Sequence, residues 1–406
     1  MNRDFDVIVA GAGPVGLATA LLLRRAGIAP ARIAVVDRRL PQSLDHIRSQ
    51  PMDLRVFALS RASERILRAC DAWVGIRATR ASAYERMQVW HADVPPHGGD
   101  ALTFDAAEIG ERDLGIIVEN SVMQSALADA ANRAGITLIE GEVSTLGFDA
   151  AVTMGVGSEP LRAKLVVGAD GSQSRVRELA GLSTSRADYG QIALVAMVTT
   201  TRPHQNTAWQ RFLGDGTLAF LPLADGASSI VWSVPAARAE GLLTAAPEAF
   251  ERELTRDFDG ALGDVKLASP RVKFPLWRMS ADRYVIARVA LVGDAAHVVH
   301  PLAGQGANLG LLDAAALAEV IAEGLAQRED PGAERILRRY ERWRRSENDL
   351  MSASIDAFDR LLARGSGKWA EAAQRGMPWV NRAGPVKRMF IERAMGLAGE
   401  LPATAR

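Results

Sequence analysis

Glycines and a carboxylate near the start of the chain have the types and spacing of a nucleotide site. Gly11, Gly13 and Gly16 form a G-x-G-x-x-G pattern, and Asp37 follows about 20 residues later. Such glycines let the backbone approach a pyrophosphate, and a carboxylate at this distance can accept hydrogen bonds from ribose hydroxyls. The pattern predicts that a dinucleotide binds here, and a plain tight turn with a solvated Asp37 is the alternative.

The carboxylate of Asp37 narrows the choice of dinucleotide. It would repel the 2′-phosphate of NADP, although Arg38 and Arg39 stand beside it. NAD and FAD both remain.

A second stretch that could face a nucleotide, VALVGDAAHVVHPLAGQGANLGLLDAAAL, occupies residues 289–317. It predicts a strand that delivers Asp294, then a loop with Gly304, Gly306 and Gly310 around the start of a helix. Backbone N–H groups of such a loop can face an electron-rich ring, and Asp294 can accept from a polyol hydroxyl. An NAD dehydrogenase does not need this second segment, so it favours FAD.

Other motifs have simpler explanations. Asp170 ends an expected strand before Arg175 and Arg177, which helix capping and exposed arginines would explain equally well. His297 and His300 suggest a metal, but no cysteine or acidic cluster completes a ligand set. The chain has no G-x-S-x-G hydrolase motif, and GSGK at 365–368 lacks the Walker spacing.

The surrounding pattern predicts an α/β protein. Apolar runs with turn signals indicate strands at 5–10, 32–37, 165–169 and 284–293, and helices at 17–26, 121–134 and 308–325. Residues 190–275 are β-rich, with turn signals at Gly214 to Gly216 and at Gly226. Four aromatic residues in this stretch belong either to its core or to an apolar substrate pocket: Trp209, Phe212, Phe220 and Trp232.

We predict a Rossmann-like FAD-binding domain with an inserted antiparallel β-sheet substrate domain and a C-terminal helical region. The FAD-binding domain is expected to comprise residues 1–75, 100–185 and 276–335. The substrate domain is expected to comprise 76–99 and 186–275, and the helical region 336–406.

Composition restricts the class of protein. The 406 residues carry 48 Lys and Arg against 48 Asp and Glu, so no overall charge invites nucleic acid. The single cysteine, Cys70, excludes an internal disulfide or a cysteine-pair redox centre. No apolar run is long enough to span a membrane, and the start of the chain is unlike a signal peptide. These features indicate a cytoplasmic protein that can also rest on the inner face of a membrane.

Taken together, several segments resemble the FAD-dependent aromatic hydroxylases of the para-hydroxybenzoate hydroxylase type, and more narrowly their ubiquinone-biosynthesis branch. The segments are GAGPVG (11–16), DLRVFALS (53–60), GIIVEN (115–120), GADGSQSRVR (168–177), GDAAHVVHPLAGQGANLGLLD (293–313) and KRMFIERAMGLAGELP (387–402). The resemblance covers nearly the whole chain, and 293–313 is its most specific part.

The resemblance implies roles for the amino-terminal motifs. Gly11, Gly13 and Gly16 would hold the FAD pyrophosphate. Asp37 would bind the adenosine ribose, and Arg55 the pyrophosphate or ribityl region.

It also implies roles for the later motifs. Asn120 matches an amide beside the flavin, and Asp170 marks a motif associated with both flavin and NAD(P)H. Asp294 would bind the ribityl chain, and Pro301 would flank the reactive edge of the ring as the catalytic position. Ser121 departs from the pattern, since many relatives have a basic residue there. The pyrimidine end of the ring would meet the backbone of Gly304, Gln305, Gly306, Ala307 and Asn308.

The reaction implied by the resemblance uses NAD(P)H to reduce FAD and O₂ to hydroxylate an electron-rich phenol ring. Substrates of this branch are polyprenylated phenols. The basic segment near the carboxy terminus, with Trp369, Trp379, Met389 and Phe390, is expected either to rest on a membrane or a partner of a ubiquinone-biosynthesis assembly, or to be a helical bundle with a solvated face.

The sequence therefore predicts a flavoprotein monooxygenase that hydroxylates a ubiquinone precursor. Hydroxylation of a small soluble aromatic or a secondary metabolite is the alternative within enzymes. A flavin-binding assembly subunit without turnover is the alternative outside them.

Overall fold

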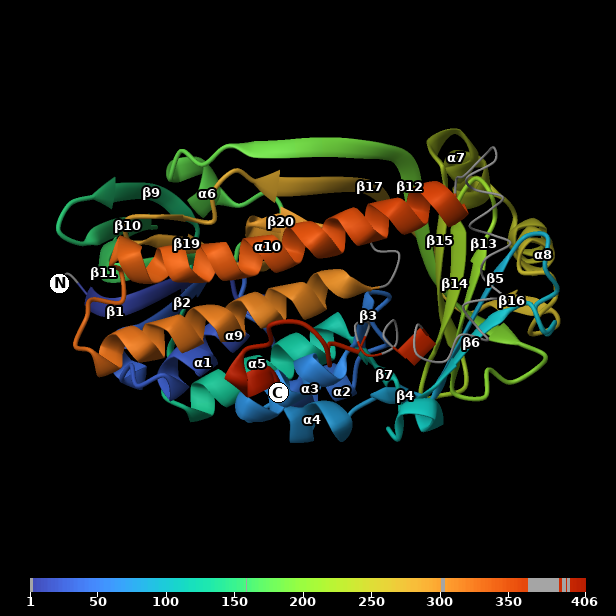
Figure 1. Ribbon diagram of the computed structural model, residues 1–406, viewed down its shortest axis with the longest axis horizontal. Coiled ribbons are helices and arrows are strands. Elements are labelled where there is room, and N and C mark those ends of the chain that lie inside the picture. The colour runs from blue at the N-terminus through green and yellow to red at the C-terminus, as the bar shows by residue number, and fades with distance from the viewer. Residues whose placement is uncertain (1–2, 158, 301–303, 364–386, 389–391, 393–394) are drawn as a thin grey trace.

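The computed structural model describes residues 3–157, 159–300, 304–363, 387–388, 392 and 395–406. Within these residues the strands form three sheets, of eight, nine and three strands (Figure 1). The eight-stranded sheet and its helices make one half of the molecule, and the nine-stranded sheet makes the other.

The eight-stranded sheet has a parallel centre. At this centre, residues 7–10, 33–36, 165–168 and 289–291 are all buried without alternation, as expected for a sheet covered by helices. The parallel strands, in spatial order, are β8 (Thr137–Glu140), β2 (Ile33–Asp37), β1 (Arg3–Ala10), β11 (Glu159–Gly168) and β19 (Val289–Leu291). Antiparallel strands extend it at β18 (Val285–Ile286), β10 (Val152–Val156) and β9 (Val143–Phe148).

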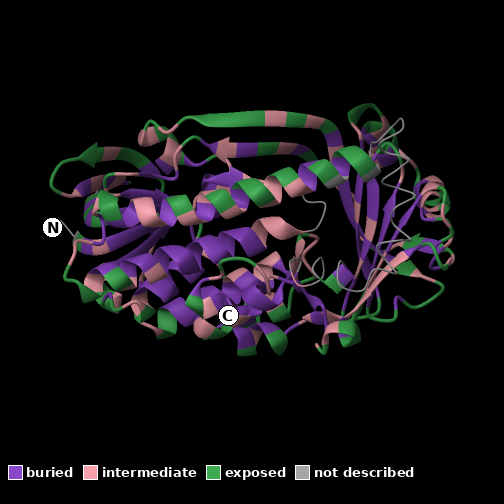
Figure 2. Cartoon of the chain, in the orientation of Figure 1, coloured by how far each residue is buried: buried purple, intermediate pink, exposed green. Residues whose placement is uncertain are grey.

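Three helices pack side by side against this sheet: α1 (Pro14–Arg25), α5 (Asn120–Arg133) and α9 (Gln305–Ala326). Figure 2 shows α1 and α9 almost wholly buried. The long helix α10 (Glu334–Phe358) lies across α9 and β18. Smaller helices are α2 (Leu44–Arg48), α3 (Arg61–Ala69), α4 (Trp73–Arg77) and α6 (Arg175–Leu179).

The nine-stranded sheet is antiparallel apart from one pair, since β5 and β13 run parallel. Figure 1 shows its long strands β12 and β17 extending toward α6 in the other half of the molecule. These two strands therefore connect the halves. Its strands in spatial order are β20 (His297–Val298), β17 (Val272–Ala281), β12 (Thr184–Thr200), β15 (Ser228–Pro235), β14 (Thr217–Pro222), β13 (Thr207–Phe212), β5 (Arg86–His91) and β6 (Leu102–Asp105), with β16 (Val265–Leu267) beside β12.

The aromatic residues of this sheet belong mainly to a core under α7 (Ala236–Thr244) and α8 (Pro247–Asp257). Trp209, Phe220 and Trp232 all lie in that cluster, and Phe220 stacks on Phe258 with ring centroids 3.8 Å apart. Phe212 packs in a smaller cluster with Val89. Of the two interpretations, the structure supports core packing for these side chains.

The three-stranded sheet lies between the two larger sheets. It consists of β3 (Val56–Leu59), β7 (Gly115–Glu119) and β4 (Ser82–Tyr84). Its side chains share a cluster with those of the nine-stranded sheet, so it forms the contact between the two halves.

Two expected elements differ from the structure. Residues 284–293 were expected to form one strand, but they fold as a hairpin because Arg288 adopts a φ of +63° and turns the chain between β18 and β19. The carboxy terminus was expected to be helical, but residues 395–406 are turns ending in one 3-10 helix, η6 (Ala403–Ala405). The glycines and prolines of this stretch explain the difference.

The remaining expected elements are present, and the predicted α/β architecture with a parallel, helix-covered sheet and a second sheet is confirmed. None of the described helices is both long and apolar enough to cross a membrane.

Candidate functional site

Four of the expected site residues lie at one edge of the parallel sheet. Ala10 pairs with Val36 on one side and Gly168 on the other, so the carboxyl ends of β1, β2 and β11 coincide. Gly168 also pairs with Leu291 of β19. Four residues at or just after these strand ends therefore lie at this edge, where open α/β sheets bind ligands: Gly11, Asp37, Asp170 and Asp294.

The three glycines of the first turn occur there for different physical reasons. A Cβ on Gly11, whose φ is +112°, would lie 2.2 Å from the Ala169 carbonyl oxygen, and a Cβ on Gly16 would lie 2.0 Å from the Gly11 oxygen. Both are required by the protein's own packing. Gly13 has an ordinary φ of −70°, and its Cβ would meet nothing within 4 Å. The space beside Gly13, at the amino terminus of α1, is therefore open to a ligand.

Asp37 is half-buried at the end of β2. Its Oδ2 accepts a 2.7 Å hydrogen bond from the Ala12 N–H, and its Oδ1 accepts from the Arg39 N–H at 3.0 Å. These bonds fix the carboxylate beside the glycine turn. Gln124 of α5, which was not singled out from the sequence, donates to the Ala12 carbonyl at 2.8 Å. Its place in the first turn after GIIVEN was the available signal.

Asp170 caps a helix and keeps one oxygen free among the described residues. Its Oδ2 accepts from the N–H groups of Arg175 and Val176 at 2.7 and 3.0 Å, which supports the capping interpretation. Its Oδ1 is buried without a hydrogen-bond partner in the part of the chain described here. A buried acceptor of this kind is expected to have a ligand or water as partner.

Asp294 lies in the short 3-10 helix η3 (Gly293–Ala295) that follows β19. Both neighbours of Asp294 are fixed, because the Gly293 N–H donates to Asp313 at 3.1 Å and the Ala295 carbonyl accepts from Arg177 at 2.8 Å. No described residue hydrogen-bonds to the carboxylate of Asp294 itself. It is half-buried and available to a ligand hydroxyl.

Arg55 and Asn120 are brought together by Asp53. The two carboxylate oxygens of Asp53 accept from the N–H groups of Arg55 at 3.0 Å and Ser121 at 3.1 Å, and the Asn120 N–H donates to the Arg55 carbonyl at 2.8 Å. The Arg55 guanidinium is exposed, 5.2 Å from the centroid of the Phe57 ring. Asp53, the first residue of the DLRVFALS segment, therefore connects these two positions.

Gly304 and the first turn of α9 place the remaining described positions at the β3–α3 junction. Gly304 adopts a φ of +61° as the first capping residue of α9, and Gln305, Gly306 and Ala307 form its first turn, all of them half-buried. A Cβ on Gly304 would lie 3.5 Å from that of Ala58. Pro301, the expected catalytic position, lies outside the described residues.

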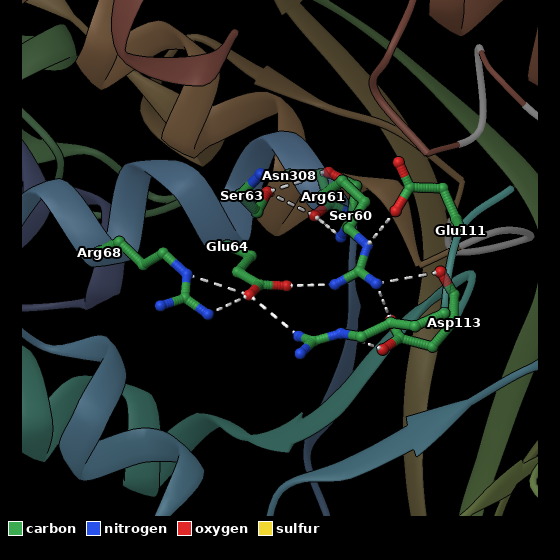
Figure 3. Close-up of polar contacts among 9 residues, drawn as sticks. Ser60, Arg61, Ser63, Glu64, Arg68, Glu111, Asp113 and Asn308 are labelled. Carbon is green, nitrogen blue, oxygen red and sulfur yellow. Dashed lines mark hydrogen bonds and ion pairs between the residues drawn. The ribbon is translucent and has the colours of Figure 1, made fainter.

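Asn308 has its side chain committed to the protein. Its Oδ1 accepts from the Ser60 N–H at 2.9 Å and from the Ser63 hydroxyl at 2.6 Å, and its Nδ2 donates to the Ala58 carbonyl at 2.9 Å (Figure 3). Only its backbone is available to a ligand, as the resemblance implies. The amide therefore ties α9 to the beginning of α3.

Charged side chains fix that same junction. Arg61 of α3 is buried and contacts Glu64 at 2.5 Å and Asp113 at 2.8 Å, with Arg68 on the far side of Glu64 (Figure 3). Burial acts to raise the pKa of Glu64, but hydrogen bonds from Arg68 and Arg61 outweigh it and the pKa is lowered. Burial raises the pKa of Asp113 despite Arg61 and Arg112. This cluster serves the junction and has no contact with the aspartates of the sheet edge.

An apolar cluster extends from this junction to the nine-stranded sheet. Ala58, next to Gly304, belongs to it together with Ile117 of β7 and Met197 of β12. Other members come from the chain before β3 and from the β14–β15 turn: Met52, Leu54, Val56, Leu221, Leu223 and Ala227. The cluster therefore reaches the amino terminus of α9 through Ala58.

The two histidines of this region do not form a metal site in the described residues, which contain no group of three or more metal-binding side chains. His297 Nε2 lies 2.5 Å from Asp313 Oδ2. The His300 ring is edge-on to Tyr189, with centroids 4.7 Å apart.

An open glycine turn, the Asp37 carboxylate beside it, and an Asp170 oxygen and an Asp294 carboxylate without partners among the described residues fit a dinucleotide that spans the sheet edge. The comparisons with known proteins agree. Residues 4–85 and 113–351 match the family described as FAD binding domain, and the chain belongs to this family.

Relatives resemble the chain over most of its length. A protein named ubiquinone hydroxylase UbiL from Rhodospirillum rubrum is 36% identical, over 97% of this chain and 90% of the relative. The 3-demethoxyubiquinol 3-hydroxylase of Escherichia coli is 34% identical, over 98% of this chain and 100% of the relative.

A solved structure confirms the fold. The p-nitrophenol 4-monooxygenase PnpA from Pseudomonas putida superposes with a TM-score of 0.76 at 19% identity, covering 98% of this chain and 100% of that one. The chain is thus an FAD-dependent protein of the aromatic hydroxylase type.

Proposed function

We propose that this chain is a monooxygenase that uses FAD, NAD(P)H and O₂ to hydroxylate the aromatic ring of a polyprenylated phenol in ubiquinone biosynthesis. One observation carries the proposal: two ubiquinone hydroxylases are 36% and 34% identical to this chain over 97% and 98% of its length. Beside the proposed cofactor site the chain also has the apolar cluster that a hydroxylase of an apolar phenol would need and that FAD binding alone would not.

The two ends of FAD would bind to different parts of the sheet edge. Gly13 and the amino terminus of α1 would receive the pyrophosphate, and Asp37 would accept from the adenosine ribose. Asp294 would accept from the ribityl hydroxyls, and Asp170 Oδ1 would face the cofactor or a bound water. Arg55 and Asn120 would lie on the flank of the flavin.

The ring of FAD would meet the first turn of α9, where the N–H groups of Gln305, Gly306 and Ala307 can donate to its pyrimidine end. When bound, FAD supplies the redox and oxygen chemistry, with NAD(P)H as a transient reductant. Pro301 would flank the ring, as the resemblance implies.

The protein's own contribution is to hold the phenol and exclude water. The cluster of Ala58, Ile117 and Met197 begins beside Gly304, so a substrate ring bound against it would lie next to the flavin. Its apolar side chains would keep water from the reacting atoms and would suit a prenylated ring. This arrangement needs no protein nucleophile.

We also propose a cellular location and a role for each part of the chain. A strongly apolar substrate suits a cytoplasmic enzyme that contacts the inner face of the membrane or a ubiquinone-biosynthesis assembly. Residues 1–75, 100–185 and 276–335 would serve FAD, residues 76–99 and 186–275 the substrate, and residues 336–406 would form the C-terminal region.

Lipid-extract mass spectrometry of a strain lacking the gene tests the proposal. The strain would be complemented with wild type or with Asp294→Ala, and the flavin content of both purified proteins would be measured. We expect a prenylated phenol one oxygen short to accumulate and only wild type, which should be yellow, to remove it. The structure of that intermediate would identify the hydroxylated carbon.

Two other results would contradict the proposal. Unchanged quinone in the deletion strain would move the substrate to a soluble aromatic compound. Rescue by Asp294→Ala protein shown to contain no flavin would favour an assembly role without turnover.

A further inference from the structure

A buried carboxylate lies directly behind the Asp294 turn. Asp313 of α9 is fully buried, and its Oδ2 accepts from the Gly293 N–H at 3.1 Å and contacts His297 Nε2 at 2.5 Å. Its Oδ1 accepts from Arg344 Nε at 2.8 Å and from Asn348 Nδ2 at 3.1 Å. One side chain therefore joins the turn to β20 and α10.

The turn has little freedom to move away from Asp313. Gly293 adopts a φ of +59°, and a Cβ there would lie 3.2 Å from Val15. A Cβ on Gly310, one helical turn before Asp313, would lie 3.2 Å from the Gly293 Cα, so α9 packs directly on the turn. From the other side, Arg177 donates to the Ala295 carbonyl at 2.8 Å. The residues on both sides of Asp294 are therefore held, while Asp294 has no side-chain hydrogen bond to a described residue.

Packing alone does not require an ionic group at this position. A buried carboxylate paired with Arg344 and His297 has a large desolvation cost, and apolar side chains of similar volume often stabilise a core equally well. What an apolar side chain could not do is accept the Gly293 N–H. That contact is the one that reaches the proposed cofactor site.

We propose that Asp313 is a positioning residue for FAD: by accepting the Gly293 N–H it fixes the η3 turn and aims the Asp294 carboxylate at the ribityl chain. The inference rests on the proposed function, in which Asp294 binds that chain. Asp313 itself does not touch the cofactor.

Asp313→Asn tests the inference, with Glu341→Gln as the matched control. Asparagine keeps the volume of the side chain but replaces one accepting oxygen with a donor. Glu341 is another buried carboxylate, on α10, and it accepts from the Tyr284 and Val285 N–H groups at the β18 hairpin. The dissociation constant of FAD would be measured by flavin fluorescence on apoprotein, and unfolding of the same apoproteins by urea titration.

We expect Asp313→Asn to raise the dissociation constant roughly tenfold or more, the effect of losing a hydrogen bond to a charged group. Glu341→Gln should leave the dissociation constant within about twofold, because its amide oxygen can still accept from both N–H groups. If both variants weaken FAD binding in proportion to their loss of stability, the inference is overturned. Should Asp313→Asn fail to fold, Arg177→Gln would be used instead. It removes the hydrogen bond from half-buried Arg177 to the Ala295 carbonyl, and it should weaken FAD binding in the same way.

A double-mutant cycle separates positioning from general stability. If Asp313 acts through Asp294, then Asp313→Asn should change FAD affinity by less than about twofold in an Asp294→Asn background. Full multiplication of the two effects would overturn the inference. If wild type and Asp313→Asn bind FAD equally well, only this inference is overturned. If wild type binds no FAD, the proposed function is contradicted as well.

Discussion

At the scale of single residues, the same amino acid serves different purposes within one motif. Gly11 and Gly16 are required because a Cβ would collide with backbone oxygen atoms, whereas Gly13 leaves space that the protein itself does not fill. Gly11 and Gly16 are therefore needed for the fold to form, whereas Gly13 leaves room for a ligand to approach. This difference can be measured.

Gly13→Val should fold normally but lose flavin, because its side chain would fill the space proposed for the pyrophosphate. Gly16→Val should lower the free energy of unfolding by roughly 3 kcal/mol or more, since its Cβ would meet the Gly11 oxygen. Urea unfolding of the apoproteins and the flavin content of the purified proteins would test both. Equal destabilisation by the two substitutions would contradict the assignment.

Asp313 predicts a pH dependence of stability. Burial acts to raise the pKa of Asp313, but His297 and Arg344 outweigh it and lower the pKa to about 2 from 3.8. A lowered pKa contributes stability above the unfolded value that is lost as pH falls through the folded value. The free energy of unfolding of wild type should therefore fall toward that of Asp313→Asn between pH 4 and pH 2, by on the order of 2 kcal/mol. A constant difference over this range would contradict the prediction.

At the scale of elements, the amino terminus of α9 is connected to the β3–α3 junction by one amide. Asn308 bonds to Ser60, Ser63 and Ala58, and the charged cluster around Arg61 holds the same junction from the other side. The first turn of α9, proposed to meet the flavin ring, is thus anchored through Asn308.

Asn308→Ala should remove these hydrogen bonds and leave the Ser60 N–H and Ala58 carbonyl unpaired. We expect the free energy of unfolding to fall by about 3 kcal/mol, with weaker FAD binding as a second effect. Arg68→Ala, which removes an exposed partner of Glu64 in the same cluster, should cost less than about 1 kcal/mol. Urea denaturation of both apoproteins would decide, and an equal loss would show that Asn308 has no special role.

At the scale of the whole molecule, residues 395–406 pack against the half that contains the eight-stranded sheet. The Met395 carbonyl accepts from the Arg61 N–H at 3.1 Å, and the Ala405 carbonyl accepts from Arg65 at 3.2 Å, so this segment packs on α3. Close by on the same helix, Cys70 lies 1% exposed, and burial raises the pKa of its thiol. Cys70 can therefore report on opening of this half.

A thiol reagent should label Cys70 only when the FAD-binding half opens, because the thiolate is needed for reaction and the side chain is buried. Adding FAD should slow labelling further, since a ligand that binds the native state stabilises it. Labelling followed by absorbance at increasing urea would measure both, with Cys70→Ser as the blank. Rapid labelling of the native holoprotein would contradict this view.

The sequence determined the architecture and much of the sheet edge, because both depend on local patterns. Apolar strands, the glycine turn and the aspartates Asp37, Asp170 and Asp294 at or just after three strand ends can be recognised from local sequence, and parallel strands end at one edge. Tertiary structure alone decided how those residues are supported. Asp313 meets Gly293 from 20 positions away, Asn308 meets Ser60 across the fold, and the choice of a hairpin at Arg288 depends on the contacts of a left-handed residue. Such partners share no periodicity or spacing, and only packing of α9 and α10 against the sheet brings them within reach.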